Sequence, residues 1–206
     1  MNEKNKRERK KQQKRNLIYK TFIDLLQKEG YDKLSTNHIS EEAKIGIGTI
    51  YRHFPEGKAA IAKGYFEYIK DKIIDEEFFR QASEKDLSEF FQLLISKHLK
   101  VYRGNLEAFL AYEQALLSNK ELFKNHGISV YEFAKETVKK LRKGSDSYQN
   151  IPEERFIKGF LLIYNIIEAI THRHLAIIPM FKSDEDLIKY LTNVVLFSIQ
   201  YLQNSL

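Results

Sequence analysis

The sequence predicts an all-α fold in which three short N-terminal helices precede a larger C-terminal helical bundle. Helix breakers are scarce, since the 206 residues include only 3 Pro and 9 Gly. Apolar side chains make up 43% of the chain and charged ones 30%, as in ordinary folded domains. Apolar residues recur at helical spacing over most of the chain, which favours helices over strands.

The composition also excludes several kinds of site. The chain has no Cys, so disulfides, thiolate nucleophiles and sulfur-ligated metals are absent. No uninterrupted apolar stretch reaches the roughly 20 residues of a membrane-spanning helix, and no signal-peptide pattern follows the basic N-terminus. We therefore expect a cytoplasmic protein without a membrane partner, a metal site or a cofactor.

The net charge of +6 is concentrated in the first part of the chain. Residues 1–60 carry 14 Lys or Arg against 8 Asp or Glu, whereas residues 61–206 carry 20 of each. Eight of these basic residues lie among the first fifteen, in a tip that we expect to fray in isolation. A solubilising tail and an arm that follows phosphates or enters the minor groove are equal alternatives for this tip. A basic module beside an electrically balanced body indicates a polyanionic partner, nucleic acid first and an acidic membrane surface second.

A first helix is predicted to end near Glu29. Apolar residues recur at helical spacing from Leu17 to Leu26, and Gly30 then supplies a stop.

A helix-turn-helix is predicted directly after this helix. Ser35 or Thr36 caps its first short helix. We expect Gly46 to adopt the left-handed conformation that ends this helix and forms the turn. The residues expected to face inward are Ile39 and Ala43 on the first of the two helices, and Ile47, Ile50 and Phe54 on the second.

The outer face of the second of these helices carries groups suited to the major groove of DNA. Gly48 permits close approach of the duplex, while Thr49 and Tyr51 can hydrogen-bond phosphates. Arg52 has the planar fork that matches guanine, and a phosphate contact is an equal alternative for it.

Six further helices are predicted from residue 58 onward. Their ranges are 58–80, 86–102, 105–118, 119–142, 153–175 and 184–204, separated by turn and cap residues. We therefore expect two domains. Residues 1–57 form a helix-turn-helix DNA-binding domain with a basic extension, and residues 58–206 form a helical domain for ligand sensing and dimerisation.

The last two predicted helices are apolar nearly all round. A helix of this kind must be buried on more than one side. A homodimer formed through these two C-terminal helices is the simplest way to cover them. The alternative is that other helices of the same subunit cover both faces.

The segment 36–54 resembles the DNA-binding region of the TetR family of bacterial and archaeal transcriptional regulators. Its string Gly48-Thr49-Ile50-Tyr51-Arg52-His53-Phe54 matches the family's glycine-threonine-aliphatic-tyrosine core and closing aromatic. The resemblance covers about residues 17–62, and beyond them only the helical architecture is shared.

This resemblance implies that Thr49, Tyr51 and His53 lie at or near the operator backbone. It also implies that Lys58 is the phosphate-contacting lysine that begins the fourth helix. Members often place this lysine three residues after the aromatic, whereas Lys58 follows Phe54 by four. The predicted DNA-binding residues are Thr36, Gly48, Thr49, Tyr51, Arg52, His53 and Lys58.

Polar residues that interrupt the apolar C-terminal helices are candidates for a ligand pocket. They are Tyr102, Arg103, Tyr112, Glu113, Gln114, Asn165, Glu168 and His172. Several of them can equally face solvent or a dimer interface. Glu168 and His172 lie four residues apart and share a helix face, where a hydrogen-bonded polar pair is favoured over a metal pair.

These features predict a ligand-responsive transcriptional regulator rather than an enzyme. We expect it to bind a palindromic operator in double-stranded DNA as a dimer, to repress by occupancy, and to be released by a small apolar or aromatic effector. Two alternatives remain. One is a helical-bundle enzyme, against which the lack of a phosphate loop or a His-Glu metal motif counts. The other is a protein that binds anionic membranes through its basic tip, which lacks bulky apolar anchors.

Overall fold

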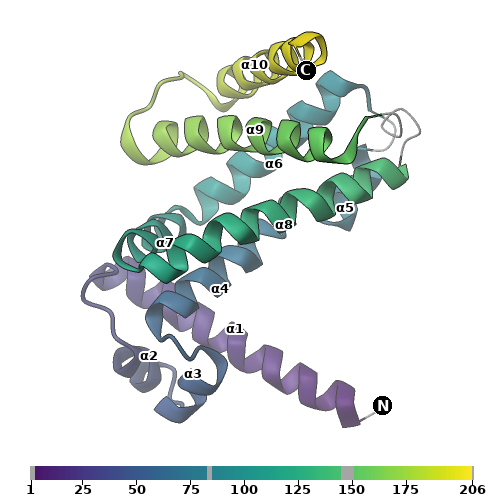
Figure 1. The fold of residues 1–206 in the computed structure, drawn as a ribbon. Coiled ribbons are helices and arrows are strands. Elements are labelled where there is room, and N and C mark those ends of the chain that lie inside the picture. The colour runs from purple at the N-terminus through teal and green to yellow at the C-terminus, as the bar shows by residue number, and fades with distance from the viewer. Residues whose placement is uncertain (1–2, 83–84, 145–150, 206) are drawn as a thin grey trace. The chain divides into compact units, whose positions relative to one another are not determined.

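A computed structural model describes residues 3–82, 85–144 and 151–205. The regular elements in these ranges are all helical, with no strand, so the predicted fold class is confirmed (Figure 1). None of the helices in these ranges is long and apolar enough to cross a membrane. The chain forms two compact units, residues 1–68 with 107–123 and residues 69–106 with 124–206. The predicted domain division at residue 57 stays a prediction.

The first unit is built around the N-terminal helices. It contains α1 (Glu3–Glu29), α2 (Thr36–Glu42) and α3 (Ile47–His53), together with most of α4 (Lys58–Lys70) and α7 (Leu106–Ser118). Helix α1 begins well before Leu17, so the basic tip extends the predicted helix. It ends as predicted, because Gly30 has a φ of 78° and its N–H donates to the Leu26 carbonyl at 2.9 Å.

The interior of this unit fixes α2 and α3 against α1. Ile18, Phe22, Ile39 and Ile50 are fully buried, and Phe54 is nearly so. A side chain at Gly64 would place its Cβ 2.6 Å from the Tyr19 hydroxyl, so glycine lets α4 approach α1 closely.

The turn between α2 and α3 differs from the prediction. Lys44, not Gly46, takes the left-handed conformation, with a φ of 52°. Gly46 has a φ of −65° and is the N-cap of α3. The turn closes early because the Ser40 hydroxyl donates to the Ile45 carbonyl at 2.6 Å and the Ile45 N–H donates to the Ser40 carbonyl. Ile47 is also exposed rather than inward, because it is the first residue of α3 and precedes the buried face.

The second unit contains α5 (Glu76–Ala82), α6 (Leu87–Gly104), most of α8 (Lys120–Gly144), α9 (Glu153–His172), a π-helical turn (Arg173–Ile177) and α10 (Asp184–Ser205). Helix α10 packs against α6 and α9, and α5 packs against α6 (Figure 1). Asp86 begins α6 with a reciprocal capping pair to Glu89. The buried core is Ile73, Ile74, Phe78, Phe91, Leu94, Ile95, Leu99, Ile163, Ile167, Leu187, Leu191 and Val195.

The predicted helix 58–80 is wrong, because two helices, α4 and α5, occupy this range. Asp75 begins α5 by accepting a hydrogen bond from the Phe78 N–H at 2.7 Å, and it also pairs with Lys97 at 2.8 Å. Ile73 and Ile74 are buried in the segment between the helices. The other predicted helices match α6 to α10 within a few residues, except that the end of the range 153–175 is the π-helical turn.

Candidate nucleic-acid interface

Local hydrogen bonds hold the two helices of the helix-turn-helix. The Ser35 hydroxyl accepts from the His38 N–H at 3.1 Å and so caps α2. The Thr36 and Tyr51 hydroxyls lie 3.1 Å apart, which joins the start of α2 to α3. This bond holds the Tyr51 ring at the surface, where it is 48% exposed.

The outer face of α3 has the polar character that the sequence predicts. Tyr51 and Arg52 are exposed, and Thr49 and His53 are partly exposed. Gly48 is exposed, and a Cβ added there would meet no atom within 4 Å. No described residue of the chain therefore covers the face at Gly48. The contacts predicted for these residues stay predictions.

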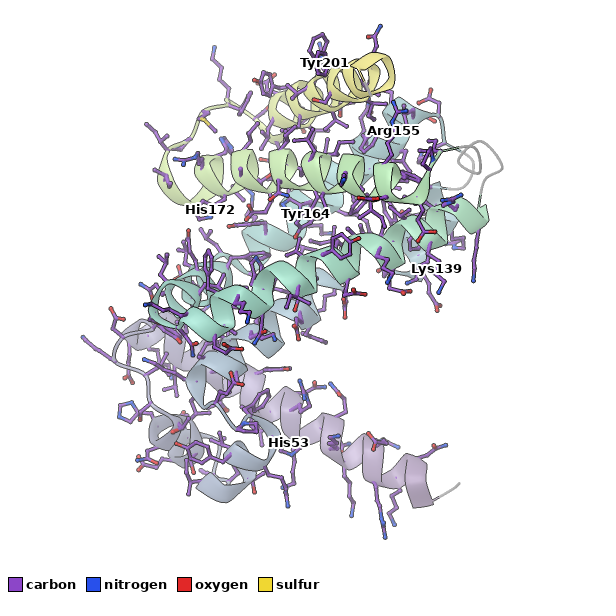
Figure 2. All side chains as sticks on the ribbon, in the orientation of Figure 1. His53, Lys139, Arg155, Tyr164, His172 and Tyr201 are labelled. Atoms are coloured by element: carbon purple, nitrogen blue, oxygen red, sulfur yellow. The ribbon has the colours of Figure 1, made fainter. Side chains whose placement is uncertain are left out.

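Basic side chains of α1 continue this face. Arg7, Lys10, Lys11 and Lys14 follow the spacing of one helical face. With Arg52 and His53 of α3 they line a surface hollow of about 300 Å³ (His53 is labelled in Figure 2). From the sequence, these α1 residues are predicted only to form part of a basic tip. Their helical spacing was the signal that could have placed them beside α3.

The pKa of His53 is affected by the positive potential of this surface. Its partial burial, followed by the charges of Arg52, Arg15, Lys11 and Lys14, lowers the pKa of the imidazole below its ordinary value. The surface thus disfavours another positive charge, as expected of a site for an anion.

Lys58 begins α4 as predicted, but its ammonium group lies against the chain between α1 and α2. Lys58 Nζ donates to the carbonyls of Tyr31 at 2.9 Å and Asp32 at 3.4 Å, and it lies 4.3 Å from the centre of the Tyr31 ring. These contacts give Lys58 a structural role in addition to the phosphate contact predicted for it.

The predicted ligand-binding residues fall into both units. Tyr112, Glu113 and Gln114 belong to the first unit, where Tyr112 is buried and its ring stacks on Phe66 with centroids 4.2 Å apart. Glu113 and Gln114 are exposed.

The other predicted ligand-binding residues belong to the second unit. The structure brings Tyr102 and His172 together, with 2.5 Å between the hydroxyl and Nδ1 (Figure 2 labels His172). Arg103 forms an exposed ion pair with Asp184. Asn165 is exposed and donates to the Leu161 carbonyl, and Glu168 is partly buried one turn before His172.

Sequence reasoning missed a small cavity in this unit. It is lined by Leu94 and His98 of α6, Phe133 of α8, Ile73 and Ile74, and four residues of α9. None of the predicted ligand-binding residues is among them. The lining comes from segments far apart in the sequence, which no local pattern could connect.

Residues 18–64 match the family model described as bacterial regulatory proteins, tetR family. A search of curated proteins gave no match.

Solved structures share the fold over most of the chain. One is the fatty acid degradation regulator FadR from Bacillus halodurans, with 17% identity, a TM-score of 0.65, and coverage of 89% of this chain and 94% of that one. A second is FadR from Bacillus subtilis, solved with stearoyl-CoA, with 19% identity and a TM-score of 0.64, and the match covers 87% of this chain and 96% of that one. A third, from Syntrophomonas wolfei, is assigned to the TetR family of transcriptional regulators. It has 21% identity and a TM-score of 0.67, and the match covers 91% of this chain and 96% of that one. Residues 18–64 are thus similar to the DNA-binding region of the TetR family of regulatory proteins, and most of the chain shares its fold with these solved structures.

Proposed function

We propose that this protein is a repressor that binds a palindromic operator as a homodimer and is released by a small effector. The observation that carries the proposal is the continuous polar and basic surface of α1 and α3. Arg52 extends from α3 within it, and four cations of α1 border the same hollow. Such a surface suits a groove flanked by two phosphate backbones.

In the proposed complex α3 enters the major groove and the basic face of α1 follows the adjacent backbone. Tyr51 and Thr49 bond phosphates, and Gly48 allows the backbone to approach. Arg52 reaches guanine or a phosphate. Because phosphate contacts position the protein without reading sequence, the α1 lysines supply affinity rather than specificity.

Exposed apolar side chains on α9 and α10 support the homodimer. Leu162 is 45% exposed and Phe197 is 71% exposed, and Tyr190 and Tyr201 are also exposed (Figure 2 labels Tyr201). Large apolar groups gathered on two neighbouring helices mark a protein interface more often than a free surface. A two-fold dimer would place the two α3 helices in successive major grooves, about 34 Å apart on a palindromic site.

Release by an effector follows from a difference in affinity. A ligand that binds the second unit more tightly in a state unsuited to the operator lowers DNA affinity by that difference. FadR from Bacillus subtilis, which shares the fold, was solved with stearoyl-CoA. Helix α4 is the proposed lever, because its chain continues from the first unit into the second.

Selection of bound fragments from a random duplex library tests this function, with affinity then measured against salt concentration. We expect a palindromic consensus and a steep salt slope. A folded protein that enriches no sequence would contradict the proposal. Repeating the selection with Arg52→Ala separates its two roles, since loss of a base contact relaxes one position and loss of a phosphate contact weakens all sequences alike.

Sedimentation of the protein tests the dimer separately. We expect a dimer for the wild-type chain and a folded monomer for Phe197→Asp, because a buried charge at the interface is costly. A wild-type monomer at micromolar concentration would remove the proposed interface.

A further inference from the structure

The cavity in the second unit contains a polar atom without a partner. His98 lines the cavity and is 3% exposed, and its buried Nε2 atom has no hydrogen bond to any residue that the structure describes. Buried polar atoms in folded proteins are nearly always hydrogen-bonded, so each exception needs an explanation. A ligand that supplies the missing partner is one.

The rest of the lining is apolar and aromatic. Among the described lining residues, Tyr164 is the only one besides His98 that brings a polar group. The others are Ile73, Ile74, Leu94, Phe133, Phe160, Ile163 and Ile167. A buried water ordinarily needs two to four polar partners, which this lining supplies poorly. An apolar molecule with one hydrogen-bonding group fits the lining better.

The charge of the ligand follows from the same residues. The described lining includes no Lys or Arg, and the nearby buried ammonium of Lys70 is held over the Phe133 ring, 4.5 Å from its centre. A carboxylate in the cavity would therefore meet no cation among the lining side chains. Burial lowers the pKa of His98 to about 4, which leaves the ring neutral near pH 7. Nε2 of a neutral imidazole donates or accepts a hydrogen bond, depending on the tautomer. A hydroxyl group can accept in the first case and donate in the second.

We propose that this cavity is the effector site, and that it takes an uncharged molecule with an aromatic body and one hydroxyl group that hydrogen-bonds His98 Nε2. The inference rests on the proposed function, because it names the ligand class for that regulation.

The size of the cavity connects this site to regulation. Its volume is about 20 Å³, enough for about one water molecule, whereas ligand sites ordinarily measure about 300 to 1,000 Å³. Binding must therefore displace lining side chains. Ile73 and Ile74 are among them, and they lie in the short segment that directly follows α4. An occupied cavity would thus move the end of the proposed lever.

Two small molecules test the hydrogen bond directly. 4-Propylphenol and propylbenzene have the same apolar body and differ by one hydroxyl. We expect calorimetry on the full chain to show 4-propylphenol binding about tenfold more tightly or better. Equal affinities, or no binding of 4-propylphenol, would overturn the proposal.

Variants assign the preference to His98. His98→Phe keeps a ring and removes the nitrogen, so it should abolish the preference for the phenol. His126→Phe, at a histidine of α8 outside the cavity lining, is the matched control and should leave both affinities unchanged. A phenol preference that survives His98→Phe would contradict the assignment.

Nitrogen NMR of ¹⁵N-histidine-labelled wild-type protein covers the case in which His98→Phe collapses the cavity. The His98 Nε2 signal should shift with 4-propylphenol and much less with propylbenzene. An unchanged signal in the presence of bound phenol would overturn the proposal. Neither measurement uses DNA. An operator selected by a protein that binds no phenol rejects this site alone, whereas binding of phenol without operator release rejects only its regulatory role.

Discussion

The helix-turn-helix and the C-terminal helices use their polar side chains in opposite ways. In the first, Tyr51 and Arg52 are exposed, and Arg52 lines a hollow together with four cations of α1. In the second, Tyr102 and His98 are buried. Tyr102 is bonded to His172, whereas Nε2 of His98 has no hydrogen-bond partner among the described residues. Exposed polar groups contribute little to folding and are available to a large charged partner. Buried ones affect stability and suit a small ligand.

Neutralising the α1 lysines tests the exposed half of this comparison and should give the largest effect. Lys10→Gln/Lys11→Gln/Lys14→Gln removes the three phosphate contacts that we propose for these side chains. The slope of log affinity against log salt should become less steep by about 2.7, and affinity at low salt should fall about a hundredfold or more. Thermal melting should change little, since all three side chains are exposed. Fluorescence anisotropy with a selected operator measures the slope.

A matched control removes the same charge elsewhere. Lys124→Gln/Lys135→Gln/Lys139→Gln neutralises three exposed lysines of α8 (Lys139 is labelled in Figure 2). An equal loss of affinity in both triple variants would mean that net charge, not the α1 surface, attracts DNA.

The buried His98 predicts that the stability of the fold depends on pH. His98 has a pKa of about 4 in the folded protein and an ordinary value of 6.5. The unfolded chain therefore binds more protons between these values, and the contribution of His98 is fully present above pH 6.5 and lost as the pH falls toward 4. We expect about 3 kcal/mol of the free energy of unfolding to disappear between pH 7 and pH 4.

Urea unfolding at several pH values measures this loss in wild type and in His98→Phe, which should lack that part of the slope. His38→Phe, at an exposed histidine of α2, should keep it. Parallel pH profiles for wild type and His98→Phe would show that His98 titrates normally.

The same contrast explains what the sequence could predict. The surface of α3 follows from residues within one short helix, because helical spacing separates buried Ile50 from exposed Tyr51. The cavity joins α6, α8 and α9, whose relative packing no local pattern describes. His98 lies in a helix rich in apolar residues, and it takes the structure to show that no described residue bonds its Nε2 nitrogen.

Two local predictions were wrong where a side-chain hydrogen bond outweighed the conformational preference of a residue or the spacing of apolar residues. Glycine favours the left-handed conformation, but the Ser40 hydroxyl closes the turn so that Lys44 adopts it. Asp75 likewise starts a new helix where apolar spacing predicted a continuous one. Capping by a side chain depends on tertiary surroundings as much as on sequence.

Lys58 combines a structural role in the fold with a predicted contact to DNA, so its substitution sharpens the comparison between buried and exposed polar groups. Lys58→Met removes the hydrogen bonds to the Tyr31 and Asp32 carbonyls and the contact with the Tyr31 ring. We expect the free energy of unfolding to fall by about 1 to 2 kcal/mol, measured by urea titration. Lys20→Met, at an exposed position of α1, should cost less than about 0.5 kcal/mol. If Lys58 acts only on phosphate, stability will be unchanged and the salt slope alone will fall by about 1.

The smallest expected effect belongs to the Tyr51 hydroxyl. Tyr51→Phe keeps the ring on α3 and removes one hydroxyl, so operator affinity should fall by about 1 kcal/mol, or roughly fivefold. Stability should change by less than about 0.5 kcal/mol because the Thr36–Tyr51 bond is exposed. A double-mutant cycle with Thr36→Val then separates two mechanisms. Additive losses of affinity would mean that the two hydroxyls contact DNA independently. A double variant no weaker than Tyr51→Phe would mean that Thr36 acts by orienting Tyr51, whereas full affinity in Tyr51→Phe would remove the hydroxyl from the interface.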